Sequence, residues 1–299
     1  MTGAGMLRVA SVNMLYGGID AGGSRDRWQA LTGFLREQEP DVLLCQEMAA
    51  ARPSGVERHL LETARSLGLT PAALGPPAPG AASGSEHHTA VLVRPRLEVT
   101  DFGPAAAYQP WDHVPWAEAL LRVPGLPSPV RFYSVHLPYS SAIGQAHYAS
   151  KLASRIAARA EQGEQALAAG DWNCLAPGDA YTQDQLAAMP ARVRPARIRL
   201  LPGGTLEPIL DVHYVLAGVG LADIAATLPK GRRNPPGLTP TGTAGGRVDR
   251  AYATHALATA VTDCRQVRTA ATDHDVLLLT VDVTRAATSG EPNGQSDRR

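Results

Sequence analysis

The sequence has no long hydrophobic run. Of its 299 residues, 44% are hydrophobic, yet no stretch approaches the roughly 18 consecutive apolar residues that a membrane-spanning helix needs. The first residues also lack a basic segment followed by an apolar core, so we expect no secretory signal there. We therefore predict a cytoplasmic protein without a membrane span.

Cysteine is scarce. The three cysteines, Cys45, Cys174 and Cys264, form no C-x-x-C pair. A disulfide framework needs a denser and even set, and a structural zinc site needs paired thiols. The sequence therefore excludes both as organising features, and three free thiols fit a reducing compartment.

Excess charge of either sign is also missing, because 28 basic residues balance 28 acidic ones. A non-specific polyanion binder gains most of its affinity by neutralising phosphates, and zero net charge argues against that class. From Ala187 to Arg250, however, nine basic residues stand against four acidic ones. This local excess is compatible with a groove that follows a phosphate backbone and equally with solvated arginines. Aromatic residues are only 5% of the chain, which leaves little obvious surface for stacking on bases.

A serine-nucleophile motif is absent too. Acyl hydrolases of the α/β type carry the serine in a G-x-S-x-G turn, and Gly84-Ser85 lacks the flanking glycines. The sequence thus gives no support to acyl transfer.

What the sequence does contain is a series of short apolar runs interspersed with a few helical segments. The predicted strands are 7–14, 42–45, 90–93, 119–123, 130–136, 166–169, 248–253, 258–264 and 276–283, and the predicted helices are 28–38, 56–67 and 141–160. Turn-rich composition predicts surface loops at 71–85 and 229–246 and a disordered tail at 286–299. We expect one domain over residues 1–285, a sheet-rich α/β or α+β fold of two packed sheets.

Polar residues stand where these apolar runs end. They are Asn13, Glu47, His136, Asp171 with Asn173, Asp249, and Asp273 with His274. Burying such a group without a partner costs several kcal/mol, so each must meet a partner, a metal or solvent. If the strand ends converge, they form an oxygen-rich cleft with two imidazoles. Such a donor set suits Mg²⁺ or Mn²⁺ and metal-assisted hydrolysis of a phosphoester.

The order of these motifs resembles the endonuclease/exonuclease/phosphatase superfamily. The motifs are Asn13, Gln46-Glu47, His136-Leu137, Gly170-Asp171-Trp172-Asn173, Arg247-Val248-Asp249 and Thr272-Asp273-His274. That superfamily includes pancreatic-type deoxyribonuclease, AP endonucleases, neutral sphingomyelinases and inositol polyphosphate 5-phosphatases. The resemblance runs from about Leu7 to Val283. It implies an α+β fold, the deoxyribonuclease I-like four-layer α/β/β/α sandwich, with the site at one edge of the paired sheets.

The resemblance also implies a metal centre. Glu47 matches the principal metal ligand, and Asn13 matches the amide that supports the metal beside it. Asp273 is expected to approach the same ion. Mg²⁺ or Mn²⁺ is the implied cofactor, and one ion and two ions both remain open.

Catalytic roles follow from the same resemblance. Asp171 matches the carboxylate that activates water, and Asn173 matches an amide that contacts the phosphate and Asp171. His274 matches the histidine that contacts the scissile phosphate, and Asp249 matches its carboxylate partner. His136 matches the second histidine of the deoxyribonuclease, sphingomyelinase and 5-phosphatase branches, and we expect it to contact the phosphate and help protonate the leaving oxygen.

Some positions depart from the family pattern. Arg247 follows two glycines where many nucleases carry an aromatic residue, and we expect it to contact substrate. AP endonucleases usually have tyrosine in the region of His136, which disfavours that branch. Asp275 either adds charge near the phosphate or faces solvent. Glu86 or His87 is a candidate support for the acid histidine, and a surface loop position is the alternative.

The sequence therefore predicts a divalent-metal-dependent phosphoesterase, and nuclease-type phosphodiester hydrolysis is the leading hypothesis. DNA or RNA is the expected substrate, and we expect a monomer. A small-molecule, phospholipid or metabolite phosphoester is the alternative, and a non-catalytic scaffold is the third interpretation.

Overall fold

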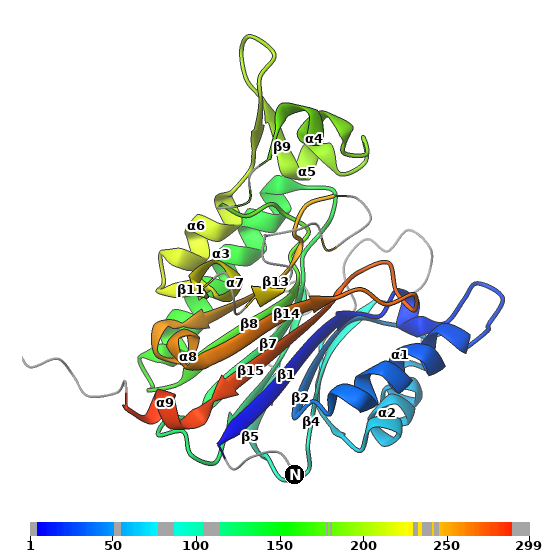
Figure 1. Ribbon diagram of the computed structural model, residues 1–299, viewed down its shortest axis with the longest axis vertical. Helices are drawn as coiled ribbons and strands as arrows, with labels where there is room; N and C mark the ends of the chain where they lie inside the picture. The colour runs from blue at the N-terminus through cyan, green and yellow to red at the C-terminus, as the bar shows by residue number, and fades with distance from the viewer. Residues whose placement is uncertain are drawn as a thin grey trace, which may run out of the picture.

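The structure is a computed structural model that describes residues 5–50, 55–76, 87–103, 114–177, 179, 181–229, 233–234, 241 and 245–288. Two mixed sheets pack face to face, and helices cover both outer faces (Figure 1). This is the four-layer α/β/β/α arrangement that the sequence resemblance implies. Within the described residues, none of the helices is both long enough and apolar enough to cross a membrane.

The first sheet has seven strands. In spatial order they are β12 (Arg233–Asn234), β14 (Val261–Val267), β15 (Val276–Asp282), β1 (Met6–Asn13), β2 (Val42–Met48), β4 (His88–Val93) and β3 (Thr70–Leu74). β1 and β2 run parallel at its centre, with Asn13 opposite Gln46.

The second sheet has six strands. They are β11 (Leu221–Asp223), β13 (Asp249–Thr254), β8 (Gln165–Asp171), β7 (Val130–His136), β6 (Trp116–Arg122) and β5 (Glu98–Gly103). β7 and β8 are parallel, which brings His136 opposite Asp171, and β13 runs antiparallel with Asp249 opposite Asp171. Three site residues thus stand side by side on one sheet.

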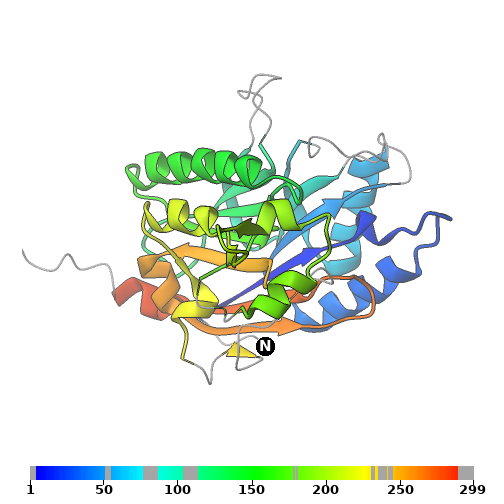
Figure 2. The same ribbon diagram turned by 90° about the horizontal axis from the view of Figure 1, so that it is seen from above.

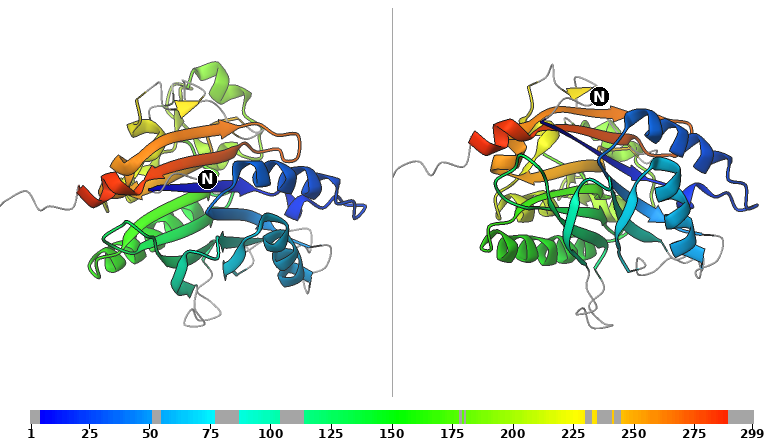
Figure 3. Two further views of the ribbon diagram at one scale, coloured as in Figure 1. Left: turned by 60° about the horizontal axis from the view of Figure 1, so that its bottom comes forward. Right: turned by 90° about the horizontal axis from the view of Figure 1, so that it is seen from below.

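The helices form the two outer layers. α1 (Asp26–Gln38) and α2 (Val56–Leu67) cover the first sheet, and α3 (Ala142–Ala160) with α6 (Asp211–Ala217) covers the second (Figures 2 and 3). The short elements are η1 (Tyr16–Gly18), α4 (Gln183–Ala188), α5 (Arg194–Arg197), β9 (Ile198–Leu200), β10 (Leu206–Pro208), α7 (Ile224–Thr227), α8 (His255–Ala260) and α9 (Val283–Thr288). α4, α5 and the β9–β10 hairpin project at the top of Figure 1.

Alternation along the strands explains the layers. In β2, Val42 and Leu44 point into the core between the sheets, whereas Leu43 and Cys45 point at α1 and α2. A strand side chain alternates between faces with period two, so a continuous apolar run is what a strand buried on both faces requires. α2 supplies the matching helical stripe, with Val56, Leu60, Ala64 and Leu67 buried against the sheet.

Most predicted elements are present, and three local predictions are wrong. Residues 258–260 belong to α8 rather than to a strand, because this alanine-rich stretch favours helix and packs Leu257 and Ala260 between the sheets. Residues 71–74 lie in β3 rather than in a loop, since an edge strand tolerates Pro71. α9 extends to Thr288, three residues into the predicted tail, and the rest of that tail lies outside the described residues. Most of the predicted loop at 229–246 lies outside them too.

Candidate active site

The site lies where the carboxyl ends of β1, β2, β7 and β8 meet the start of β13. Asn13 and Glu47 come from the first sheet, and His136, Asp171 and Asp249 come from the second. The strand pairing within each sheet sets their register, and the packing of the sheets brings the two groups together.

The side-chain amide of Asn13 connects the two sheets. Its Nδ2 donates to Glu47 Oε1 at 3.1 Å and to Asp171 Oδ2 at 3.2 Å, while its Oδ1 accepts from the backbone N–H of Leu15. Asn13 is fully buried. The amide therefore fixes two carboxylates that would otherwise repel each other.

Asp171 stands at the centre of the site. Its Oδ1 accepts the backbone N–H of Asn173 at 2.9 Å. Its Oδ2 lies 3.7 Å from Nε2 of both His136 and His274. Burial alone would raise the pKa of Asp171, but the nearby imidazoles of His274 and His136 and the Asn173 N–H lower it. Asp171 is therefore a carboxylate at neutral pH.

His274 is oriented by Asp249. Its Nδ1 lies 2.9 and 3.0 Å from the two carboxylate oxygens of Asp249, which leaves Nε2 directed at Asp171. Burial alone would lower the pKa of His274, but Asp249 and Asp171 raise it to about 10. Burial raises the pKa of Asp249 in turn. At neutral pH the imidazole is thus a cationic hydrogen-bond donor.

The loop that carries His274 is tied to the first sheet. Thr272 Oγ1 donates to the backbone carbonyl of Asn13 at 2.7 Å, and the His274 N–H lies 3.4 Å from the same hydroxyl. The hydroxyl of Thr272 therefore anchors the loop that carries Asp273 and His274 to the end of β1. Thr241, which the sequence did not indicate, makes a similar anchor: its Oγ1 accepts the N–H groups of Val248 and Asp249 at 3.0 and 2.9 Å.

Asn173 is held by residues that the sequence analysis did not single out. Its carbonyl accepts from Gln145 Nε2 at 3.0 Å and from Arg197 Nε at 3.2 Å. Its Nδ2 donates to the carbonyl of Leu137, and Arg197 lies 3.4 Å from its Oδ1. Arg197 is 2% exposed. In the sequence Arg197 is one arginine of the basic segment from Ala187 to Arg250, and no spacing rule distinguishes it from its neighbours.

Two backbone features position the motif residues: left-handed residues at two strand ends and a glycine between two closely packed strands. Glu47 and Asn173 both have φ 51°, in the left-handed region, at the points where the chain leaves β2 and β8. Gly170 has φ 154°, and a Cβ there would lie 1.9 Å from the carbonyl oxygen of Val135. Only glycine lets β7 and β8 approach this closely beside His136 and Asp171.

Arg247 is not part of this group. Its guanidinium is fully buried and pairs with Asp223 at 2.6 Å and Asp179 at 3.1 Å. These two carboxylates hold the side chain inside the protein, so the structure gives no support to the expected substrate contact. Asp275 pairs with Arg268 at 2.8 Å. It is only 7% exposed, so the alternative that it faces solvent does not hold.

The structure also places the remaining candidates. His87 lies with Nδ1 3.7 Å from Glu47 Oε2, beside the site. The neighbouring His88 has its Nδ1 2.8 Å from the carbonyl oxygen of Gly75. Glu86 lies outside the described residues.

The donor set fits a divalent cation. Glu47 and Asp171 offer carboxylate oxygens, and Asp273 Oδ1 is buried with no hydrogen-bond partner among the described residues. The ring nitrogen of His136 lies 3.8 Å from Glu47 and 3.7 Å from Asp171, too far for hydrogen bonds. Carboxylate oxygens of Asp171 and Asp249 and a ring nitrogen of His274 lie within 4.8 Å of one another, but a protonated imidazole is not a metal ligand, so the carboxylates are the donors. Hard oxygen donors of this kind suit a divalent cation such as Mg²⁺ or Mn²⁺.

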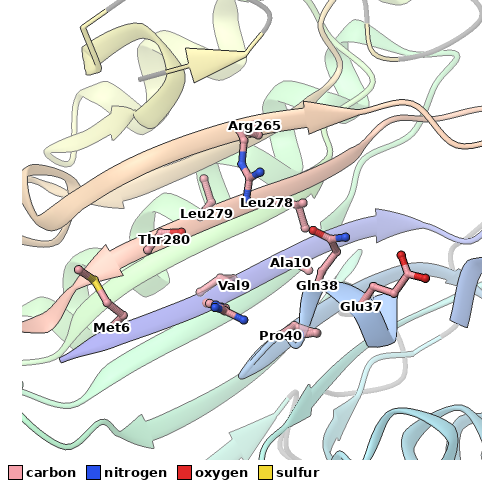
Figure 4. Close-up of a pocket in the computed structure, with 11 residues that line it drawn as sticks. Met6, Val9, Ala10, Glu37, Gln38, Pro40, Arg265, Leu278, Leu279 and Thr280 are labelled. Atoms are coloured by element: carbon pink, nitrogen blue, oxygen red, sulfur yellow. The ribbon is translucent and has the colours of Figure 1, made fainter. Parts of the chain in front are cut away.

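A separate pocket of about 340 Å³ lies beside the C-terminal end of α1, over β1 and β15 (Figure 4). Its lining includes Arg8, Glu37, Arg265 and Thr280 and none of the residues of the site. Both arginines have acidic partners, Glu39 and Asp263. The pocket therefore plays no part in the chemistry considered above.

Comparison with known proteins gives a family match. A model of the endonuclease/exonuclease/phosphatase family matches residues 10–274. Among curated proteins none matches the chain.

Solved structures share the fold at low identity. An AP endonuclease from Archaeoglobus fulgidus has 16% identity and a TM-score of 0.60, over 92% of this chain and 99% of its own. An endonuclease/exonuclease/phosphatase from Bacteroides vulgatus has 14% identity and a TM-score of 0.63, over 92% and 98%. A Neisseria 3′ phosphatase bound to a product DNA hairpin has 14% identity and a TM-score of 0.61, over 92% and 99%. At these identities the likeness shows the fold alone.

Proposed function

Because the chain belongs to the endonuclease/exonuclease/phosphatase family, we propose that it is a divalent-metal-dependent phosphodiesterase that cleaves nucleic acid. The observation that carries the proposal is the position of Asp171, whose Oδ2 lies 3.7 Å from Nε2 of both His136 and His274. One carboxylate close to two imidazoles can orient a water while the imidazoles contact the phosphate.

Asp171 is the residue that prepares the water. Its lowered pKa keeps it ionised, and its Oδ1 is already occupied by the Asn173 N–H. Oδ2 accepts the Asn13 amide and lies 3.7 Å from Nε2 of both histidines. Because a carboxylate oxygen can accept more than one hydrogen bond, Oδ2 can also accept one from the attacking water and direct it in line with the leaving oxygen. Asn13 holds this carboxylate in place.

His274 and His136 are the residues that donate hydrogen bonds and protons to the phosphate group. His274 is cationic, since the pKa is raised to about 10, so its Nε2–H donates to a non-bridging oxygen as negative charge develops. His136, with a side chain 13% exposed, has its Nε2 3.7 Å from the same Asp171 oxygen and donates a proton to the leaving oxygen. Asn173 and Arg197 keep the Asp171 side of the site rigid.

Glu47, Asp171 and Asp273 are the residues that would hold Mg²⁺ or Mn²⁺. When bound, such an ion polarises a phosphate oxygen and offsets charge in the transition state. Asn13 keeps Glu47 directed into the site by donating to its Oε1.

The test is hydrolysis of supercoiled plasmid and of bis-(p-nitrophenyl) phosphate, each with Mg²⁺, Mn²⁺ or EDTA. We expect metal-dependent nicking by the wild type and a loss of at least about a thousandfold in Asp171→Ala, because the water loses its orienting carboxylate. Arg199→Met, in the exposed β9, is the matched control and should match the wild type. Cleavage of the small diester alone would favour a metabolite or lipid phosphoester. Nicking that survives in Asp171→Ala with an unchanged circular dichroism spectrum would refute the assignment.

A further inference from the structure

The loop after β1 has an unusual backbone. Leu15, Tyr16, Gly17 and Gly18 have φ values of 48°, 58°, 67° and 74°, so four consecutive residues lie in the left-handed region. Leu15 and Tyr16 are not glycines, and each is strained there. Strain of this kind persists only where surrounding contacts impose it, and it is concentrated at functional sites.

Contacts on several sides impose this conformation. A Cβ on Gly17 would lie 2.2 Å from the carbonyl oxygen of Ala49, and one on Gly18 would lie 2.8 Å from Trp28 Cα. The Gly17 carbonyl meets His59 Nε2 at 2.7 Å. Arg27 donates to the carbonyls of Leu15 and Ile19, both at 3.0 Å. The loop is therefore a rigid structure that holds Tyr16 in one place.

That place is the rim of the site. The backbone N–H of Tyr16 donates to Glu47 Oε2 at 3.2 Å. Its ring meets the ring of His87 at 4.8 Å between centroids and 85° between planes, and His87 is itself 3.7 Å from the Glu47 carboxylate. Even so, Tyr16 is 43% exposed. An open aromatic ring is thus fixed beside a carboxylate that we expect to hold the metal.

We propose that Tyr16 is a stacking platform for a nucleobase next to the scissile phosphate, so that single-stranded nucleic acid is the preferred substrate. This inference rests on the function proposed above and narrows it. Every nucleobase has a π-face that stacks on an aromatic side chain, whereas a phospholipid headgroup offers none. A base in a duplex already stacks on its neighbours, and an unpaired base is free to use the ring.

Binding without metal isolates this contact from catalysis. The two probes are a thymidine hexanucleotide and an abasic hexamer of tetrahydrofuran phosphodiesters, which carries the same charge without bases. In EDTA, calorimetry should give a Kd about tenfold lower for the thymidine hexanucleotide with the wild type, because one stacked base supplies about that factor. Tyr16→Phe keeps the ring and should keep this ratio.

Tyr16→Ala should bind the two probes equally, with the loss confined to the thymidine hexanucleotide. Tyr16→Asn provides a second ringless variant, because asparagine tolerates a left-handed backbone and the fold is then not at risk. Tyr214→Ala removes another exposed tyrosine, 62% exposed on α6, and should behave like the wild type.

The outcomes separate this inference from the function on which it rests. Cleavage of both hexamers in Mg²⁺ or Mn²⁺, with a wild-type affinity ratio below twofold or a ratio that survives in Tyr16→Ala and Tyr16→Asn, would overturn the role of Tyr16 alone. Absence of cleavage of either hexamer and of plasmid would overturn the proposed function and this inference with it.

Discussion

The imidazole of His274 lies against both carboxylate oxygens of Asp249, with Nδ1 at 2.9 and 3.0 Å. The two residues are 25 positions apart: Asp249 begins β13 of the second sheet, and His274 lies in the loop before β15 of the first. This pair closes the site on one side and fixes which ring nitrogen of His274 faces Asp171. A buried carboxylate and imidazole in such contact also couple the stability of the protein to pH.

The first prediction concerns this pH dependence. The pKa of His274 is raised from 6.5 to about 10 in the folded protein. A group with a raised folded pKa contributes stability that is complete below the unfolded pKa and is lost as pH rises through the folded value. In EDTA, urea unfolding should therefore show His274→Gln less stable than the wild type by about 3 kcal/mol at pH 6. The difference should shrink steadily between pH 6.5 and pH 10.

His255→Gln is the control for this measurement, because His255 begins α8 and lies outside the site. Its difference from the wild type should stay small and constant over the same range. A His274→Gln deficit that grows as pH rises would show that the imidazole is neutral beside Asp249.

Arg197 gives the second prediction. Its guanidinium contacts Asn173 at the carbonyl and at Oδ1 and contributes to the lowered pKa of Asp171. Arg197→Met should lower kcat about 10- to 100-fold with little change in KM, because misplacing a site residue by an ångström costs up to that factor. Loss of the charge should also raise the pKa of Asp171, so the acidic limb of the pH–rate profile should move to higher pH.

Arg199→Met provides the comparison for Arg197→Met. Arg199 lies two residues further along, in β9, where its exposed side chain pairs with Glu207 at 3.5 Å. We expect wild-type kinetics from it, since exposed pairs contribute little. An Arg197→Met enzyme with a normal kcat and an unmoved acidic limb would assign Arg197 to packing only.

Gly170 gives the third prediction. A methyl group there would meet the Val135 carbonyl oxygen at 1.9 Å and would force β7 and β8 apart. Gly170→Ala should reduce the free energy of unfolding by about 3 kcal/mol or more. Gly33→Ala in α1 should instead stabilise the protein by about 0.5–1 kcal/mol, because a Cβ added at Gly33 would have nothing within 4 Å. Equal effects in urea denaturation would contradict the close approach of the two strands.

The strand-end residues could be predicted because each is a polar group beside a buried apolar run. Asn13, Glu47 and Asp171 have this signature, and the parallel pairs β1–β2 and β7–β8 then bring them to one edge. The layers could be predicted for a related reason. A run such as Val42 to Cys45 is apolar at every position only when both faces of the strand are covered.

Arginine roles could not be predicted in this way. Arg197 and Arg247 both belong to the basic segment, yet Arg197 reaches Asn173 and Arg247 is buried against Asp223. An arginine side chain is long, and its partner is set by tertiary packing rather than by a local period. The role of Tyr16 could not be predicted for another reason. Its position depends on the left-handed backbone of a loop in which only Gly17 and Gly18 give a sequence signal.

The fourth prediction tests the bridge made by Asn13. Its amide donates to Glu47 and Asp171 at 3.1 and 3.2 Å, so Asn13→Asp would put a third carboxylate against these two. In EDTA the variant should lose about 2–4 kcal/mol of unfolding free energy, because like charges replace two hydrogen bonds in a buried place. A divalent cation should offset this repulsion. Saturating Mn²⁺, at about 100 times its Kd, stabilises a protein with a single site by about 2.7 kcal/mol. We expect Mn²⁺ to raise the Tm of Asn13→Asp more than that of the wild type.

Asn13→Ser is the control, because it removes the bridge without adding charge. The rise in Tm that Mn²⁺ causes in this variant should not exceed the rise in the wild type. An equal Mn²⁺ shift in all three proteins would mean that the ion does not bind among these carboxylates, and the assignment of Glu47 and Asp171 as its ligands would fall.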